Sequence, residues 1–367
     1  MRARVTKKDI LPAVMRAVSV ADKKSVVPIL SHVLLSFDKD GLTLKATDLD
    51  ISVIEKVPAD IDTFGVVAIP AGTFGDIIRK APDNATLEFS LTDGGNKLLV
   101  TTGKSKFELS TLDSSDFPAI NLLTSENEFK VKPEDLNKLI SLTKISMSPE
   151  ENRHNLNGIY FHTEDGKLIA ASTDGHRLSV SQISMPEGAN IPGVIISKKS
   201  ILEIKKLLDA CAGEVSVIFS SNQVQLSCDN TVFLSKLVDG VFPEYKRVIP
   251  EKNENFFTVK RDDFIGIVDR VAVISDDKVR SVKLELTGNS LSCYVASNRL
   301  GSGKDEVTVA YEGEGWNAGF NASYLLEVAQ VLSGSEMKIF VKDTLSPILI
   351  IDESDEDSLF VIMPMRI

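Results

Sequence analysis

The sequence reads Ala-Ser-Thr-Asp-Gly-His-Arg-Leu-Ser-Val at residues 171–180, and a shortened form of this stretch occurs twice more. Ala46-Thr47-Asp48-Leu49-Asp50 lies 126 residues earlier, and Ala296-Ser297-Asn298-Arg299-Leu300 lies 124 residues later. An acid, an imidazole and hydroxyl groups close together suggest an active site, but a catalytic motif is rarely written three times in one chain. The repeats instead favour a turn in a repeated module, closed by an Asx-type hydrogen bond from Asp174.

Apolar residues at helical spacing recur with nearly the same offset, which predicts one amphipathic helix in each copy. In the second copy Pro133 stands at the first-turn position that tolerates proline. In the first copy Pro12 fits less well, and it predicts a late helix start or a kink. The apolar faces consist of Ile10, Val14 and Ala17, of Leu136, Ile140 and Thr143, and of Phe264, Val268 and Val271.

Each helix is followed by two strand-like runs around a turn of the kind found in tight hairpins. A second helix and further strands complete each copy, with helical segments at 74–80, 201–208 and 324–332. The three hairpins comprise 32–37 and 42–47 around Asp40-Gly41, 158–162 and 168–173 around Asp165-Gly166, and 282–287 and 291–296 around Gly288-Asn289.

These agreeing offsets predict three tandem copies of an α+β module of about 125 residues each. The expected domains are 1–122, 128–250 and 254–367. The full length of 367 residues suits two or three domains of this size. The last apolar run, 360–367, is expected to be a final strand tied into a sheet.

Composition excludes some classes of protein and places others in doubt. No window approaches the length of apolar sequence that spans a bilayer, and the N-terminus has no secretory h-region, so we expect a cytoplasmic protein without membrane contact. Cys211, Cys228 and Cys293 show no ligand-type spacing and are expected to be reduced core thiols. A net charge of −11 argues, taken alone, against a nucleic-acid partner.

Catalytic, metal and phosphate sites fit the sequence poorly. Ser172, Asp174 and His176 are alternate residues of one stretch, which cannot readily form the hydrogen-bonded chain of a triad. The other histidines do not repeat the spacing, so no metal or cofactor is expected. The run Gly301-Ser302-Gly303-Lys304 lacks two residues of a phosphate loop and is expected to be a flexible loop.

The predicted helices are the basic part of an acidic chain. They hold 15 Lys and Arg against 10 Asp and Glu, so their net charge is +5 while the rest of the chain carries −16. An ordinary solvated helix face is the alternative explanation, and it is the less favoured one. If the repeats place the helices on one surface, however, that surface suits a phosphate backbone without reading its sequence.

Several motifs, in order over the full length, resemble the bacterial DNA polymerase III beta subunit family, the replication sliding clamps. The resemblance implies helices lining a central channel, antiparallel sheets outside, and a head-to-tail homodimer around double-stranded DNA, bound independently of sequence. It also implies no catalytic activity, and partners that include the polymerase III alpha subunit, the clamp loader and other proteins with a clamp-binding motif. The motifs are Ala46–Leu49, Ser110–Leu112, Asp116–Pro118, Leu156–Gly158, Thr173–Leu178, Ser235–Gly240, Phe242-Pro243 and Met363–Arg366.

The resemblance also implies three sets of site residues. A pocket for partner peptides would be formed by Arg153, Leu156, Thr173, Gly175, His176, Arg177, Leu178, Pro243, Arg247, Val248, Leu345, Val361, Met363, Pro364, Met365 and Arg366. Residues facing DNA would be Lys24, Arg79, Lys80, Lys198 and Lys199. The dimer seam would hold Lys104, Lys106, Phe107, Leu109, Val273 and Ile274. The chain departs from the family pattern at Glu150, His154, Asn155 and Pro347.

Two alternatives to a clamp stay open at this point. One is an acidic interaction scaffold that never touches DNA, which the net charge of −11 suggests. The other is a hydrolase that uses Asp174 and His176.

Overall fold

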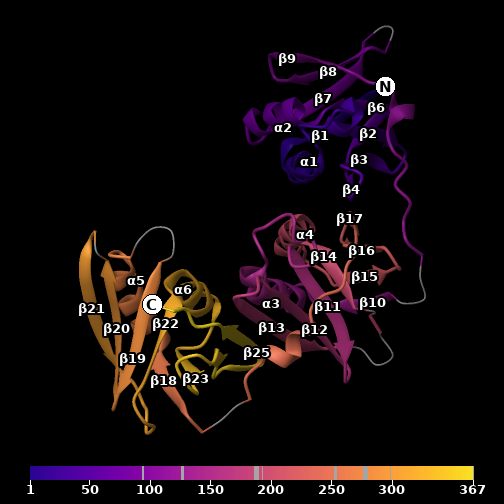
Figure 1. Ribbon diagram of the computed structural model, residues 1–367. Coiled ribbons are helices and arrows are strands. Elements are labelled where there is room, and N and C mark those ends of the chain that lie inside the picture. Colours follow the sequence, from indigo (N-terminus) through magenta and orange to yellow (C-terminus); the bar gives the residue numbers. More distant parts are fainter. Residues whose placement is uncertain are drawn as a thin grey trace. The chain divides into compact units, whose positions relative to one another are not determined.

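The computed structural model describes residues 1–92, 95–124, 128–185, 190–191, 193–251, 254–275, 280–297 and 299–366 (Figure 1). The chain divides into two compact units. Unit 1 contains residues 1–134 and 202–237, and unit 2 contains residues 135–201 and 238–367. A search of the described helices finds none that is long and apolar enough to cross a membrane.

Six α-helices in the described residues follow the predicted pattern, two in each sequence copy. Ile10, Val14, Ile140 and Val268 are buried, as their helical spacing predicts. The first helix begins at Lys7, capped by the Thr6 side chain, so the late start predicted from Pro12 is wrong. The helices are α1 (Lys7–Val20), α2 (Ala71–Lys80), α3 (Pro133–Thr143), α4 (Lys198–Ala210), α5 (Arg261–Ala272) and α6 (Ala322–Val331).

The strands of unit 1 form two antiparallel sheets. The larger sheet joins strands from the first and second sequence copies, because Leu234 in β17 pairs with Ser52 in β4. The smaller sheet has the order β5 (Asp60–Thr63), β1 (Arg2–Thr6), β7 (Thr86–Leu91), β8 (Lys97–Thr102) and β9 (Ser105–Ser110). The larger has the order β10 (Glu128–Val131), β15 (Val215–Phe219), β16 (Gln223–Cys228), β17 (Thr231–Lys236), β4 (Ile51–Val57), β3 (Gly41–Thr47), β2 (His32–Asp38) and β6 (Gly65–Pro70).

Unit 2 repeats this design with strands from the second and third copies. Here Leu178 in β13 pairs with Val361 in β25, so the predicted C-terminal strand is confirmed in the centre of a sheet. The larger sheet has the order β14 (Val194–Ser197), β11 (Gly158–Glu164), β12 (Lys167–Thr173), β13 (Arg177–Ser184), β25 (Asp355–Ile362), β24 (Ile348–Asp352), β23 (Glu336–Phe340) and β18 (Phe256–Lys260). The smaller has the order β21 (Gly301–Thr308), β20 (Ser290–Ser297), β19 (Ser281–Thr287) and β22 (Trp316–Asn321).

Helix pairs form the cores with the sheets: α1 lies mainly against β3 and β4 of the larger sheet of unit 1, and α5 lies mainly against β20 and β21 of the smaller sheet of unit 2. In unit 1, α2 approaches α1 so closely at Gly75 that an added Cβ would lie 2.7 Å from Cγ2 of Val18. In unit 2, Phe264 of α5 and Leu325 of α6 pack with Phe320 of β22 in one buried cluster. The α+β class, with paired helices and antiparallel sheets, is thereby confirmed.

Two further predictions from the sequence are wrong. Cys211 and Cys228 are joined by a disulfide across 17 residues, with Cα atoms 6.1 Å apart, because the end of α4 lies against the end of β16. Only Cys293 is a free buried thiol. The run Gly301–Lys304, expected to be a flexible loop, is the start of β21, where it pairs with β20 from Ser297 to Tyr294.

Candidate functional site

The stretch around Asp174 forms a closed turn between β12 and β13. Oδ1 of Asp174 accepts hydrogen bonds from the backbone N–H groups of His176 at 2.9 Å and Arg177 at 3.1 Å. The Thr173 hydroxyl donates to the Arg177 carbonyl at 2.6 Å and accepts from the Gly175 N–H at 3.0 Å. Gly175 has a φ of +92°, a backbone conformation that favours glycine. The Asx-type turn is confirmed.

The first copy builds the same turn with the same bonds. Asp48 accepts from Asp50 at 2.9 Å and from Ile51 at 2.7 Å, while Thr47 donates to the Ile51 carbonyl at 2.9 Å. In the third copy the Ser297 hydroxyl accepts from two following N–H groups, and Asn298 lies outside the described residues. The recurrence identifies the motif as structural.

The polar side chains of the middle copy are arranged for structure rather than for catalysis. The Ser172 hydroxyl is buried and donates to the Thr143 carbonyl, so it does not face His176. His176 is exposed, whereas both Asp174 oxygens are engaged within the turn and with Arg177. A nucleophile held by a histidine, which a hydrolase of this type requires, is not formed by these residues.

Arg177 is the centre of an ionic network. The sequence singles out Arg177 and Asp174 but does not predict the partners Glu327 and Tyr324. The Arg177 side chain is only 8% exposed and donates to Asp174 at 3.0 Å and to Glu327 at 2.7 Å. The guanidinium also lies 4.2 Å from the ring centroid of Tyr324, as in a cation–π contact. Burial raises the pKa of the Tyr324 hydroxyl. Tyr324 and Glu327 stand at i and i+3 on α6 and so lie on one face of that helix, but nothing in the sequence links this face to Arg177.

The structure brings one part of the predicted pocket together. Leu156 packs against the buried cluster that contains Leu178 and Val361. Met363 donates its N–H to the His176 carbonyl at 2.9 Å, which places the C-terminal segment beside the Asp174 turn. Arg153 borders the same turn, since its Nη1 donates to the Asp174 carbonyl at 3.3 Å.

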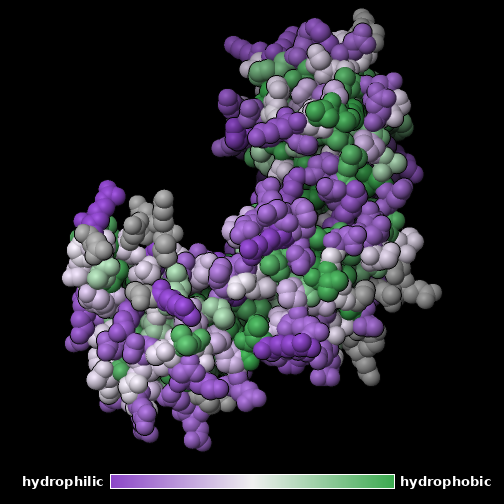
Figure 2. Space-filling model, viewed as in Figure 1, coloured by the Kyte–Doolittle hydropathy of each residue, from purple (hydrophilic) through white to green (hydrophobic). Residues whose placement is uncertain are grey.

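Other predicted pocket residues are exposed side chains of unit 2. Leu345 is 71% exposed, and Val248 and Met363 are also exposed apolar side chains. Beyond Pro364, Met365 donates its N–H to the Gly319 carbonyl at 2.8 Å, which fixes the end of the chain on β22. The face seen in Figure 2 is largely polar, with separate apolar groups in each unit. The exposed residues of the predicted pocket set are Arg153, Gly175, His176, Pro243, Arg247, Val248, Leu345, Met363 and Arg366.

Two residues that depart from the family pattern have structural partners here. Glu150 forms an ion pair with Arg153 at 2.9 Å. Asn155 donates its side-chain amide to the Val241 carbonyl at 3.0 Å. These contacts tie the loop before Leu156 to the rim of the predicted pocket.

The predicted DNA-facing cations differ in how available they are. Arg79 pairs with Asp76 of the same helix at 2.6 Å. Lys24 and Lys80 are exposed and have no ion pair among the described residues. At the start of α4, Lys199 is exposed and Lys198 is half-buried. Lys7, counted among the basic helices, is buried and donates to the Ala81 carbonyl at the end of α2 at 2.5 Å, where it caps that helix.

The predicted seam residues lie on or beside two open sheet edges. β9 is the last strand of the smaller sheet of unit 1, and it carries exposed Lys106 and Phe107, which is 37% exposed. Leu109 lies two residues further along β9, on the same face as Phe107, and is buried in unit 1. Lys104, in the turn before β9, is exposed.

The second open edge is β21, the last strand of the smaller sheet of unit 2. Beside it, Val273 is 78% exposed, and Ile274 lies so close that a Cβ on Gly303 would be 2.9 Å from its Cδ1. Asp305 pairs with Arg270 at 2.6 Å, and this hydrogen bond lowers the pKa of the Asp305 carboxyl. Glu306 remains exposed on the same strand.

Comparison with known proteins covers the whole chain. Family models for the N-terminal, central and C-terminal domains of the DNA polymerase III beta subunit match residues 1–121, 130–244 and 246–366. The beta sliding clamp of Caulobacter vibrioides (strain NA1000 / CB15N) is 38% identical over 372 residues, covering 100% of both chains. The beta sliding clamp of Proteus mirabilis is 35% identical, covering 94% of both chains.

Solved structures agree with this result. A sliding clamp from Bartonella birtlesii bound to griselimycin has a TM-score of 0.96 at 37% identity, and the beta subunit from Pseudomonas aeruginosa has a TM-score of 0.94 at 30% identity. Each match covers 100% of both chains. The chain therefore belongs to the bacterial DNA polymerase III beta subunit family, the beta sliding clamps, which are non-catalytic processivity factors of DNA replication.

Proposed function

We propose that this sliding clamp closes into a head-to-tail homodimeric ring around double-stranded DNA, with clamp domains at 1–122, 128–250 and 254–367. The observation that carries the proposal is the pair of open edges, β9 with Lys104 and Lys106, and β21 with Glu306. An open strand edge is a template for pairing with another chain. Because the two edges differ, a pairing of one with the other is heterologous and can close into a ring.

Opposite charges support the same pairing. Lys104 and Lys106 beside β9 can pair with Glu306 on β21, and such pairs would orient the two chains; β21 also carries exposed Lys304, and its Asp305 is paired with Arg270. The apolar side chains beside the edges, Phe107 and Val273, are exposed and suit the centre of such an interface. The rival reading, an acidic scaffold without DNA, gives no reason for two complementary edges in one chain.

Binding to DNA would depend on the cations of the helices and not on base contacts. Exposed Lys24, Lys80 and Lys199 suit phosphate groups, and an ion pair as exposed as that of Arg79 is weak enough to be exchanged. The acidic remainder of the chain would repel DNA from other surfaces. We infer that retention on DNA comes from closure of the ring, with the chain acting in the cytoplasm.

The surface around the Asp174 turn would bind linear motifs of the polymerase III alpha subunit, the clamp loader and other partners. Its apolar side chains, including Leu345 and Met363, are exposed, while Arg177 fixes the turn from below. Sliding clamps from Bartonella birtlesii and Pseudomonas aeruginosa are bound to griselimycin in crystal structures. Ligand binding in these relatives supports a binding surface here.

The partner surface can be tested with a labelled peptide that contains a clamp-binding motif. Leu345→Ala removes an exposed leucine from the surface, and Leu300→Ala removes one elsewhere in unit 2 as a matched control. We expect about tenfold weaker binding for Leu345→Ala in fluorescence anisotropy, as for a contact at the centre of an interface. Removal of residues 363–367 should abolish binding while the dimer survives. Unchanged affinity in both variants would remove the assignment of the pocket.

A further inference from the structure

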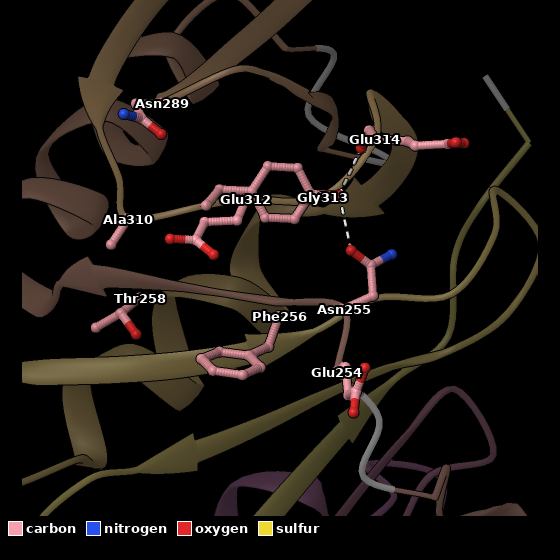
Figure 3. A pocket seen from close by; sticks show the side chains of 10 residues that line it. Glu254, Asn255, Phe256, Thr258, Asn289, Ala310, Glu312, Gly313 and Glu314 are labelled. Atoms are coloured by element: carbon pink, nitrogen blue, oxygen red, sulfur yellow. Dashed lines mark hydrogen bonds between the residues drawn. The ribbon is translucent and has the colours of Figure 1, made fainter.

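A large cavity lies in unit 2, and its lining includes no residue of the Asp174 turn. Its volume is about 820 Å³, and it opens between the start of β18 and the segment 310–314 that leads from β21 to β22 (Figure 3). Glu312 points into the space between these two segments, whereas Glu314 points away from it. None of the functions argued above uses this cavity.

One wall of the cavity is an open strand edge. β18 is the last strand of its sheet, and its N–H and C=O groups alternate between the side of β23 and the opposite side. Asn255 accepts from Val341 and Arg261 donates to Ser335, so the odd-numbered residues face β23. Phe256 and Thr258 therefore present their backbone groups to the cavity side.

Only part of this edge is covered. Thr258 and Ala310 exchange two backbone hydrogen bonds of 3.1 Å each. Within the described chain, no backbone hydrogen bond joins Phe256 to the facing segment at Glu312. The two segments diverge at this point, and the cavity occupies the gap between them (Figure 3).

The far end of the gap is held open by Tyr311. Its ring is buried, and its hydroxyl bonds to Oδ1 of Asn255 at 2.8 Å and to the carbonyl of Glu314 at 2.5 Å. Burial raises the pKa of this hydroxyl, so it remains a hydrogen-bond donor at neutral pH. Fixed at Thr258 and at Tyr311, the cavity is preformed.

The cavity is acidic and has one aromatic surface. Glu254, Glu312 and Glu314 are exposed, and none of them forms an ion pair with a cation among the described residues. The Phe256 side chain is 36% exposed, and it already has the ammonium of Lys338 at 5.6 Å from its ring centroid. Carboxylates beside an aromatic ring suit the long side chain of lysine or arginine.

We propose that this cavity binds an extended, lysine- or arginine-containing segment of a partner protein, which pairs with β18 at Phe256. The partner backbone would bond to the N–H and C=O of Phe256, in the manner of an added β-strand. Its basic side chains would reach Glu312 and Glu254, with their aliphatic stems on the Phe256 ring. The open edge supplies affinity, and the carboxylates select the sign of the partner's charge.

The test uses the full chain and a short capped peptide in which lysine and valine alternate, with a peptide of glutamate and valine as its counterpart. Glu312→Gln removes one carboxylate from the cavity, and Glu285→Gln removes an exposed carboxylate from β19 as a matched control. Affinity is measured by fluorescence anisotropy. Hydrogen exchange of the Phe256 amide, with and without the lysine peptide, reports whether a strand is added.

We expect the lysine peptide to bind and the glutamate peptide not to bind. Glu312→Gln should weaken binding about threefold, as for an exposed charge pair, and Glu285→Gln should leave it unchanged. The lysine peptide should slow exchange of the Phe256 amide. Equal losses of affinity in the two variants would mean unspecific attraction of the lysine peptide by an acidic protein. An unprotected Phe256 amide would mean that no strand is added. Either result overturns the proposal.

Discussion

Arg177 shows at the residue scale what the sequence predicts and what it leaves out. The repeated turn and its Asx-type hydrogen bond follow from residues close in sequence, because the Asp174 side chain accepts from His176 and Arg177. The ionic partner Glu327 is 150 residues away, and such contacts leave no local pattern. Arg177, which the family resemblance places in the partner pocket, is therefore a buried cation that supports the turn, and its neighbour His176 is exposed.

The first prediction concerns the stability of this network. Arg177→Ala leaves the buried Asp174 carboxylate without its cation, which should lower the free energy of unfolding by about 3 kcal/mol. Arg177→Lys should recover part of this loss, since lysine keeps the charge but not the fork of donors. Urea unfolding followed by circular dichroism gives the values.

Arg247→Ala is the matched control, because the ion pair between Arg247 and Glu244 is exposed. Its expected effect is within about 0.5 kcal/mol. Equal losses of unfolding free energy in Arg177→Ala and Arg247→Ala would show that the ionic network does not stabilise the turn.

The second prediction concerns the cysteines, whose spacing alone does not distinguish a buried thiol from a disulfide. Cys293 is buried, which raises the pKa of its thiol to about 12 and makes it unreactive. A thiol reagent without reductant should therefore modify no cysteine in the native chain and Cys293 alone in denaturant. Modification of Cys211 and Cys228 under the same conditions would contradict the disulfide.

The disulfide should also stabilise unit 1. Closing a loop of 17 residues restricts the unfolded chain and contributes about 3 kcal/mol in the chain-entropy model. Reduction of the native protein should lower the free energy of unfolding, measured by urea denaturation, by that amount. Cys293→Ser, which leaves the disulfide intact, should show the same response to reductant as the unmodified chain.

At the scale of elements, local sequence patterns predict helices and hairpins. They do not predict which strands from distant parts of the chain pair with each other. Asp165-Gly166 predicts the hairpin of β11 and β12, and both residues have positive φ, at 51° and 72°. The junction of β17 with β4 joins two sequence copies, and neither strand carries a mark of its partner. For the same reason, the sequence does not predict which strands lie at a sheet edge, since being last in a sheet is a property of the whole sheet.

The third prediction concerns the open edge β9. Phe107→Asp places a carboxylate in the middle of a basic edge that we propose meets β21, and this should cost about 2 kcal/mol of association, or about thirtyfold in the dimer dissociation constant. Phe64→Asp is the matched control, because Phe64 is an exposed phenylalanine outside β9. Sedimentation velocity should show a weakened dimer only for Phe107→Asp, and an unaltered dimer in both variants would exclude this edge from the seam.

At the scale of the whole molecule, the three sequence copies form two compact units, and the second copy is divided between them. The strands of the second copy are shared between them, because β15 to β17 continue the sheet of the first copy and β11 to β13 continue that of the third. The repeat length predicts the modules, whereas the shared sheets depend on pairings between copies. Net charge was the least informative property, since −11 for the chain conceals a net positive charge on the helices.

The central claim is that the clamp is held on DNA by a closed ring and not by affinity. It is tested most directly by loading the clamp onto nicked circular DNA with a clamp loader, isolating the complex, and then cutting the circle at one site. The account predicts that the clamp stays on the circle at a salt concentration that abolishes exposed phosphate contacts and leaves once the DNA is linear. Equal retention on circular and linear DNA would contradict it.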